Sequence, residues 1–138
     1  MRRGFTSVGY EGRSLDEFIA ALRADEVTVV ADVRLNAVSR RRGFSKTALR
    51  NALEAAGIRY VHLRALGNPP ENRAGFHAND PEPAKARFAQ LLNSSTARAE
   101  LRELASLGNS DVVAVLCVER DPQRCHRTVV IDAVRRLP

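Results

Sequence analysis

The chain has 138 residues, of which 44% are hydrophobic, and it carries a formal net charge of +6. This length suits one domain with a real core, and we predict a single α/β domain over residues 1–138. No apolar run approaches the roughly 20 residues of a membrane span, and no long apolar segment follows the basic N-terminus, so we expect neither a membrane partner nor a secretory signal. With two cysteines there is no disulfide framework, which favours a cytoplasmic protein with reduced thiols.

Strands and helices alternate along the chain, as the spacing of its apolar residues indicates. In chain order the pattern predicts a strand at 5–9, a helix at 15–24, a strand at 27–33, a helix at 46–56, a strand at 58–63, helices at 83–93 and 96–107, a strand at 112–117 and a helix at 122–136. Such alternation produces a parallel sheet joined by right-handed crossovers. We therefore predict a three-layer, Rossmann-like α/β fold, with a mainly parallel sheet of about four strands and helices on both faces.

Three helices begin at recognisable capping residues. Ser14 caps the first, and Glu17 three residues later completes a capping box. Ser45 caps the second. Asp121 is an N-cap residue for the last, with Pro122 at the first helical position. Between the third strand and the next helix, residues 68–83 contain four prolines, and we predict a surface loop there that is a candidate lid.

Polar side chains stand where the predicted strands end. Tyr10 and Glu11 follow the first strand, Asp32 and Arg34 end the second, and Glu119 follows the last. Ligands of parallel α/β sheets bind beyond the carboxyl ends of the strands, near a reversal of strand order. We therefore expect these five side chains to converge on one anion-attracting hollow.

The turn after the last strand carries Cys125 and His126. In the first turns of a helix, backbone N–H groups and neighbouring arginines would favour the thiolate, so Cys125 is a candidate nucleophile. The alternative is a small residue packed under the sheet. At 3.6 residues per turn His126 joins the buried stripe of Val130, Val134 and Leu137, whereas Cys125 lies opposite it. His126 is either a hydrogen-bonded structural residue or a general acid/base.

Arg34 and Arg127 are the candidates for binding an anion, since a guanidinium grips phosphate with two hydrogen bonds. They can also pair with Asp32 and Glu119, and the two roles can coexist. The two carboxylates could serve as nucleophile or base, as paired carboxylates do elsewhere, but structural ion pairs are the favoured interpretation.

Cys117, Glu119, Cys125 and His126 are the residue types that bind zinc. The spacing matches no standard metal motif and Cys117 is expected to point into the sheet, so we predict no metal and no cofactor. Nor does Cys125 open the phosphate-binding loop of a thiol phosphatase, because Thr128 and its neighbours continue into a helix.

An arginine-rich loop spans residues 38–44 and includes Arg40 and Arg41. It is either solvated or in contact with a nucleic-acid backbone, since phosphate contacts dominate such binding. A nucleotide or nucleic acid is therefore the predicted partner. Nothing in the sequence fixes an oligomeric state.

The motifs SVGYEGRSLDEF, VADVR, SRRRGFSK, IRYVHLRALG and LCVERDPQRCHR resemble a bacterial and archaeal family catalogued as domain of unknown function 488. The resemblance covers nearly the whole chain, and LCVE followed by CHR is its most specific part. It implies a compact three-layer α/β domain and no particular reaction. Where the family usually has a proline shortly after DVR, this chain has Asn36, Ala37 and Val38, so we expect a less rigid loop.

Three functions are consistent with these patterns. The first is an enzyme acting on a phosphate-bearing substrate. Arg34 and Arg127 would bind the anion, and Glu119 or Asp32, together with His126, would transfer protons. The second is a non-catalytic nucleic-acid-binding or regulatory module that uses its arginines alone. The third is thiol or sulfur-transfer chemistry at Cys125.

Overall fold

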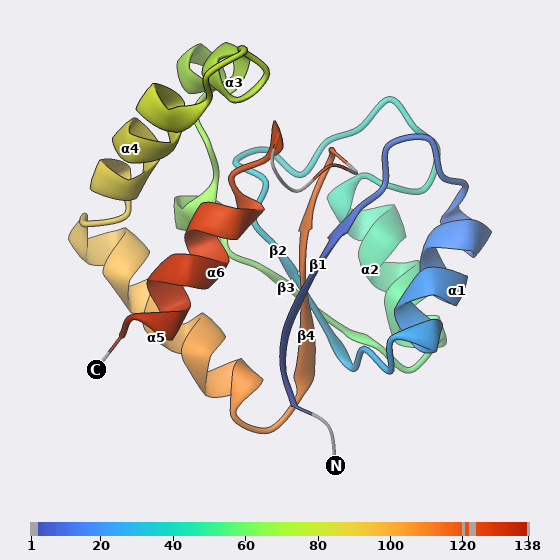
Figure 1. Cartoon of the computed structure of the whole chain (residues 1–138). Coiled ribbons are helices and arrows are strands. Elements are labelled where there is room, and N and C mark those ends of the chain that lie inside the picture. Colours follow the sequence, from blue (N-terminus) through green and yellow to red (C-terminus); the bar gives the residue numbers. More distant parts are fainter. Residues whose placement is uncertain (1–2, 120, 122–123, 138) are drawn as a thin grey trace.

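The computed structural model describes residues 3–119, 121 and 124–137 (Figure 1). Its strands are β1 (Gly4–Gly9), β2 (Val29–Asp32), β3 (Arg59–His62) and β4 (Val112–Cys117). Its α-helices are α1 (Leu15–Ala24), α2 (Lys46–Ala55), α3 (Arg73–Phe76), α4 (Glu82–Leu91), α5 (Ser95–Gly108) and α6 (Arg127–Arg135). Two 3₁₀ turns, η1 (Arg64–Leu66) and η2 (Pro70–Asn72), precede α3. None of the helices in these described residues is both long and apolar enough to cross a membrane.

The strands form one four-stranded sheet in the order β1-β4-β2-β3, and every neighbouring pair is parallel. Helices α1 and α2 lie on one face of the sheet, and α4, α5 and α6 lie on the other (Figure 1). This arrangement confirms the predicted three-layer α/β fold.

Side-chain alternation divides the core into two layers. On β4, Val113 and Val115 pack beneath α5 and α6, whereas Ala114 and Leu116 pack beneath α1 and α2. All six β4 residues are buried, because a central parallel strand is covered on both faces. The same alternation places Cys117, at the end of β4, on the side of α6.

The neighbouring strands β2 and β4 send the chain to opposite faces. The chain leaves β2 toward α2 and leaves β4 toward α6, although the two strands are hydrogen-bonded side by side. Their exits therefore diverge and leave a crevice between them, which is the topological switch point where ligands of such sheets bind.

The last helix begins later than predicted. It starts at Arg127 with His126 as its N-cap residue, so Cys125 and His126 precede the helix and do not lie in its first turns. The backbone N–H of Arg124 donates to the carbonyl oxygen of Asp121 at 3.0 Å, which closes a separate turn before the helix. Pro122, the predicted first helical residue, lies outside the described residues.

The predicted surface loop at 68–83 is also wrong in part. It contains η2 and α3, and its residues Asn68, Asn72 and Phe76 are buried. The Phe76 ring packs edge-to-face on Phe88 of α4, with centroids 6.4 Å apart. This segment is therefore a folded wall over the carboxyl edge of the sheet (Figure 1).

The two serine caps have different outcomes. Ser14 accepts from the backbone N–H of Glu17, whose carboxylate accepts from Ser14 N–H, which confirms the capping box. Ser45 makes no cap bond to α2. Its hydroxyl oxygen accepts from the backbone N–H of Ser39 at 3.0 Å and so closes the arginine-rich loop.

Gly67 offers a test of how tightly the crevice wall is packed. A Cβ at this position would lie 2.4 Å from both the backbone nitrogen and the Cα of Leu35. We expect Gly67→Ala to cost about 1–3 kcal/mol in the free energy of unfolding, the usual range for overpacking. Urea denaturation measures this. A loss below about 0.5 kcal/mol, the range of ordinary surface changes, would mean that the backbone at Gly67 and Leu35 can move apart at little cost.

Candidate functional site

A cavity of about 150 Å³ opens at the switch point between β2 and β4. Its walls come from the segment after β2, the segment after β4, and the folded wall at 68–76. The residues that line it are Arg34, Leu35, Asn36, Val38, Asn68, Arg73, Phe76, Cys117, Val118, Glu119, Arg124, Cys125 and His126. Arg34 and Glu119 therefore meet around one hollow, as the sequence predicted.

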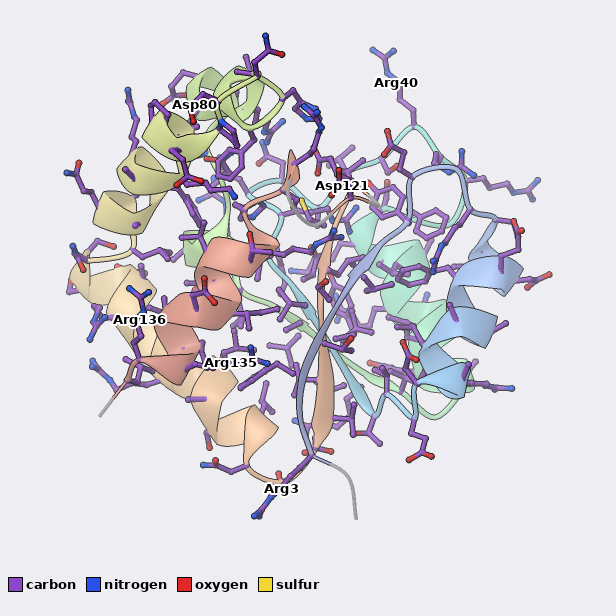
Figure 2. The ribbon with its side chains drawn as sticks, viewed as in Figure 1. Arg3, Arg40, Asp80, Asp121, Arg135 and Arg136 are labelled. Atoms are coloured by element: carbon purple, nitrogen blue, oxygen red, sulfur yellow. The ribbon has the colours of Figure 1, made fainter. Side chains whose placement is uncertain are left out.

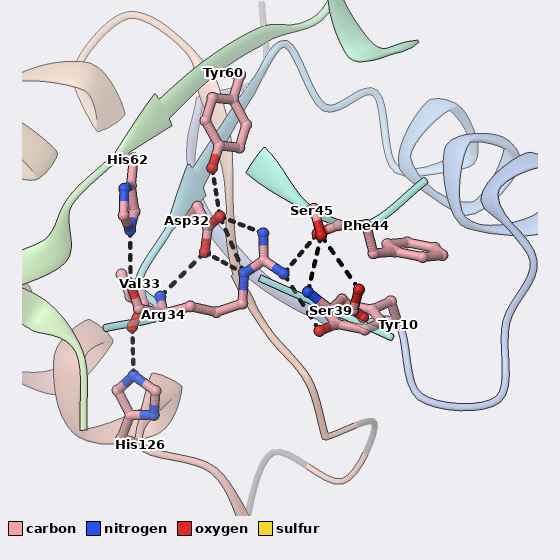
Figure 3. Close-up of polar contacts among 10 residues, drawn as sticks. All are labelled: Tyr10, Asp32, Val33, Arg34, Ser39, Phe44, Ser45, Tyr60, His62 and His126. Atoms are coloured by element: carbon pink, nitrogen blue, oxygen red, sulfur yellow. Dashed lines mark hydrogen bonds and ion pairs between the residues drawn. The ribbon is translucent and has the colours of Figure 1, made fainter. Parts of the chain in front are cut away.

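Asp32 and Arg34 form a buried ion pair at the end of β2 (Figure 3). Nε and Nη2 of Arg34 donate to the two carboxylate oxygens of Asp32 at 2.9 and 2.7 Å. Burial alone would lower the pKa of the guanidinium, but the hydrogen bond and the negative charge of Asp32 outweigh it and raise the pKa. Asp32 is fully buried, so it holds Arg34 in place and does not reach the cavity as a nucleophile.

Two tyrosines complete this buried network. Nη1 of Arg34 donates to the Tyr10 hydroxyl and to the Phe44 carbonyl oxygen, and the Tyr10 ring stacks on Phe44 with centroids 4.4 Å apart. The Tyr60 hydroxyl donates to Asp32. Burial, together with the charge and hydrogen bond of Asp32, raises the pKa of Tyr60.

Two histidines hold the backbone at the exit of β2 from either side (Figure 3). Nε2 of His126 lies 2.7 Å from the carbonyl oxygen of Val33, and Nε2 of His62 lies 2.7 Å from that of Arg34. A carbonyl oxygen only accepts, so Nε2 carries the proton in both rings. The Nδ1 of a neutral His126 then presents its lone pair.

That lone pair faces two thiols. Nδ1 of His126 lies 3.5 Å from Sγ of Cys125 and 3.8 Å from Sγ of Cys117. The pKa of the Cys117 thiol is raised well above its ordinary value, because it shares a hydrogen bond with Cys125 and is buried. Cys125 is 2% exposed, which corrects the expectation that it lies opposite the buried side. Cys125 precedes the first residue of α6, so the spacing of that helix does not set its direction.

Glu119 is the carboxylate that reaches the cavity. Its side chain is 21% exposed, and its Oε1 lies 3.4 Å from Nε2 of His77. Burial would raise the pKa of this carboxyl, but hydrogen bonds from its own backbone N–H, from His77 and from the thiols of Cys117 and Cys125 lower it overall. Glu119 is therefore ionised at neutral pH.

Sequence reasoning missed three residues around the cavity mouth: Arg73, His77 and Arg124. Arg73 and His77 belong to the segment taken for a loop. Arg124 donates from Nη1 to the carbonyl oxygen of His77 at 2.9 Å, which joins that segment to the turn before α6. The four prolines of residues 68–83 favour a loop, and Phe76, an apolar residue among polar ones, was the available signal for a folded wall.

Six predicted site residues do not line the cavity. One is Asp32, which holds Arg34 in the buried ion pair. Arg127 is fully buried, and a Cβ added to Gly9 would lie 2.6 Å from its Nη1, so its side chain runs beside the end of β1. Tyr10 lies behind Arg34, as described above. The other three are exposed charged residues outside the cavity wall, Glu11, Arg40 and Arg41.

The arginine-rich loop points mainly away from this site. Arg40 is exposed and extends into solvent (Figure 2). Arg41 donates to the backbone carbonyl oxygen of Arg13 and lines a separate shallow depression with Arg13 and Arg42. Of this loop, Val38 alone lines the cavity.

A family model described as "Domain of unknown function DUF488" matches residues 14–134. The chain belongs to this family. The matched range includes every residue that lines the cavity, so the DUF488 pattern contains the whole site. A search of curated proteins and a search of solved structures each found no match.

The Asp32–Arg34 pair yields a stability prediction. Asp32→Asn leaves the guanidinium buried without a counter-charge, and breaking a buried pair in this way costs about 3–5 kcal/mol. We expect a loss of that order in urea denaturation at neutral pH. Asp111→Asn is the control, since Asp111 is an exposed carboxylate that also accepts from a hydroxyl, and its effect should be much smaller. Equal losses in the two variants would contradict a structural role for the pair.

Tyr60 yields a pH prediction. A group whose pKa is raised by folding contributes stability that is complete below its unfolded pKa, about 10 for tyrosine, and is lost as pH rises through the folded value. Wild type should therefore exceed Tyr60→Phe in stability at pH 8, and the difference should shrink above about pH 10. Urea denaturation of both proteins over that range measures the difference. A constant difference would show that Tyr60 ionises equally in both states.

Proposed function

We propose that the DUF488 cavity binds the phosphate group of a small ligand and that Glu119 acts on that ligand as a general base. The observation that carries the proposal is the composition of the cavity wall at the switch point. Three arginines, Arg34, Arg73 and Arg124, line the same cavity as one ionised carboxylate, Glu119.

The charges favour an anion. The charge of Arg34 is balanced by Asp32, whereas Arg73 and Arg124 are exposed at the mouth. Nε of Arg73 makes only a long contact of 3.4 Å to the Asn68 carbonyl oxygen. The guanidinium group of Arg73 can therefore turn toward a phosphate and grip it with paired hydrogen bonds. Arg124 is held by the bond from its Nη1 to the His77 carbonyl oxygen, and it adds positive charge at the mouth.

The size of the cavity supports a phosphate with a small group attached. Sites for drug-sized ligands are usually about 300–1,000 Å³, so a whole nucleotide would not be enclosed. The remainder of a nucleotide would lie across the rim, where Val38 is 76% exposed. This apolar surface beside the cavity suits a sugar or base.

The roles of the remaining groups follow from their partners. Glu119 is placed to accept a proton from water or from a ligand hydroxyl. His126 holds the Val33 carbonyl with one nitrogen and faces the thiols with the other, so we assign it a positioning role instead of proton transfer.

Binding of inorganic phosphate and of a nucleoside monophosphate tests the proposal. By isothermal titration calorimetry, Arg73→Gln and Arg124→Gln should each weaken phosphate binding about tenfold or more, since a hydrogen bond to a charged group contributes about 1.5–3 kcal/mol. Glu119→Gln should tighten phosphate binding, because it removes a negative charge from the cavity. Higher salt should weaken binding in all variants.

Arg40→Gln is the matched control, because Arg40 is an exposed arginine outside the cavity. It should leave phosphate binding unchanged. If phosphate does not bind at low salt, the proposal fails. If a single-stranded oligonucleotide binds and depends on Arg40 and Arg41 but not on Arg73 and Arg124, the chain is a nucleic-acid-binding module and the cavity proposal is likewise overturned.

A further inference from the structure

The two cysteines, with His126, form a compact group on the α6 side of the sheet. The ligand atoms of Cys117, Cys125 and His126 all lie within 4.8 Å of one another. Both cysteines are free thiols, and all three side chains line the cavity although they are nearly buried. They are therefore clustered, nearly buried and accessible from the cavity.

The ring of His126 is fixed in the orientation that a metal ligand requires. Its Nε2 donates to the Val33 carbonyl oxygen, and its ring packs edge-to-face on Phe88 with centroids 5.0 Å apart. A backbone carbonyl on the far nitrogen is the usual partner of a metal-binding histidine, because it fixes the tautomer and leaves the other nitrogen to the metal. That other nitrogen, Nδ1, is the atom that faces both thiols.

The separations match a tetrahedral zinc site. Bonds of about 2.3 Å to sulfur and about 2.05 Å to nitrogen, at a tetrahedral angle, imply an S···N distance of about 3.5 Å. The distances from Nδ1 to Cys125 and to Cys117 are 3.5 and 3.8 Å. No large movement of the chain is needed to place one ion between these three atoms.

We propose that Cys117, Cys125 and His126 bind a zinc ion, with the fourth coordination position facing the cavity. Thiolate and imidazole ligands in tetrahedral arrangement select zinc over hard, oxygen-seeking cations. Two thiolates and one imidazole with an open position form a known type of catalytic zinc site. Glu119 lies beside this group, with Oε2 3.5 Å from Sγ of Cys117.

This zinc site is not predicted from the sequence, because its ligands follow no standard spacing. Seven residues separate Cys117 from Cys125, and Pro122, one of them, predicted a helix. The fold supplies the proximity instead: the end of β4 directs Cys117 toward α6, and the turn before α6 returns Cys125 and His126 to it.

Cobalt substitution tests the proposal. The reduced full-length protein, freed of metal with a chelator, should bind one equivalent of Co²⁺ anaerobically. Its spectrum should show d–d bands of a tetrahedral ion and a thiolate-to-cobalt charge-transfer band, and Zn²⁺ should abolish both by displacement. Bound zinc should also protect both cysteines from alkylation.

Ligand variants make the test specific. Cys117→Ser and Cys125→Ser should each reduce the charge-transfer band by about half and weaken zinc binding at least about 100-fold, since changes even to the partners of metal ligands cost 10–100-fold. His62→Asn is the matched control, because His62 also donates from Nε2 to a backbone carbonyl but lies away from the thiols, and it should bind cobalt like wild type. Circular dichroism establishes that each variant is folded.

Two results would overturn the site. One is wild-type protein, shown to be folded and reduced, that gives no charge-transfer band. The other is a band that persists in the Cys117→Ser/Cys125→Ser double variant, which would mean adventitious binding elsewhere. Neither result bears on phosphate binding, because the zinc ligands do not include Arg73 or Arg124.

Discussion

The site depends on one topological constraint: β2 and β4 are neighbours, yet the chain leaves them toward opposite faces of the sheet. No backbone can fill the space between two diverging exits, so side chains must occupy it or leave it open. The first residues beyond each strand therefore become the wall of the cavity. This explains why residues 34–38 and 117–119, far apart along the chain, line the same hollow.

Side-chain alternation then divides the polar groups between the two faces of the sheet. Asp32 points toward α1 and α2, where it holds Arg34, whereas Cys117 points toward α6, where it meets Cys125. The chain segment that leaves β2 lies between the two groups and contacts both. His126 is hydrogen-bonded to the carbonyl oxygen of Val33, and His62 is hydrogen-bonded to that of Arg34. The ion pair on one face and the thiol cluster on the other therefore fix the same stretch of backbone, and the shape of the cavity depends on both.

Local signals predicted the parts of the structure that local physics determines. Apolar runs marked the strands, the Ser14 capping box marked α1, and parallel topology brought Arg34 and Glu119 to one edge. The rest depends on tertiary contacts. Phe76 orders the proline-rich segment by packing on Phe88, which no period in that segment reveals. The turn before α6 is closed by a backbone hydrogen bond at Asp121, so helical spacing placed Cys125 on the wrong side and separated it from Cys117.

The two proposed ligands occupy one cavity without requiring each other. Two thiolates carry a charge that balances Zn²⁺, and His126 adds none, so a zinc ion bound by these three residues would leave the net charge of the hollow nearly unchanged. The attraction for phosphate would still come from Arg73 and Arg124 at the mouth, neither of which is a zinc ligand. Charge repulsion between Glu119 and a phosphate opposes phosphate binding. A cation beside Glu119 would screen this repulsion. Zinc would therefore offset the charge of Glu119, and it would change the affinity for phosphate only through that effect.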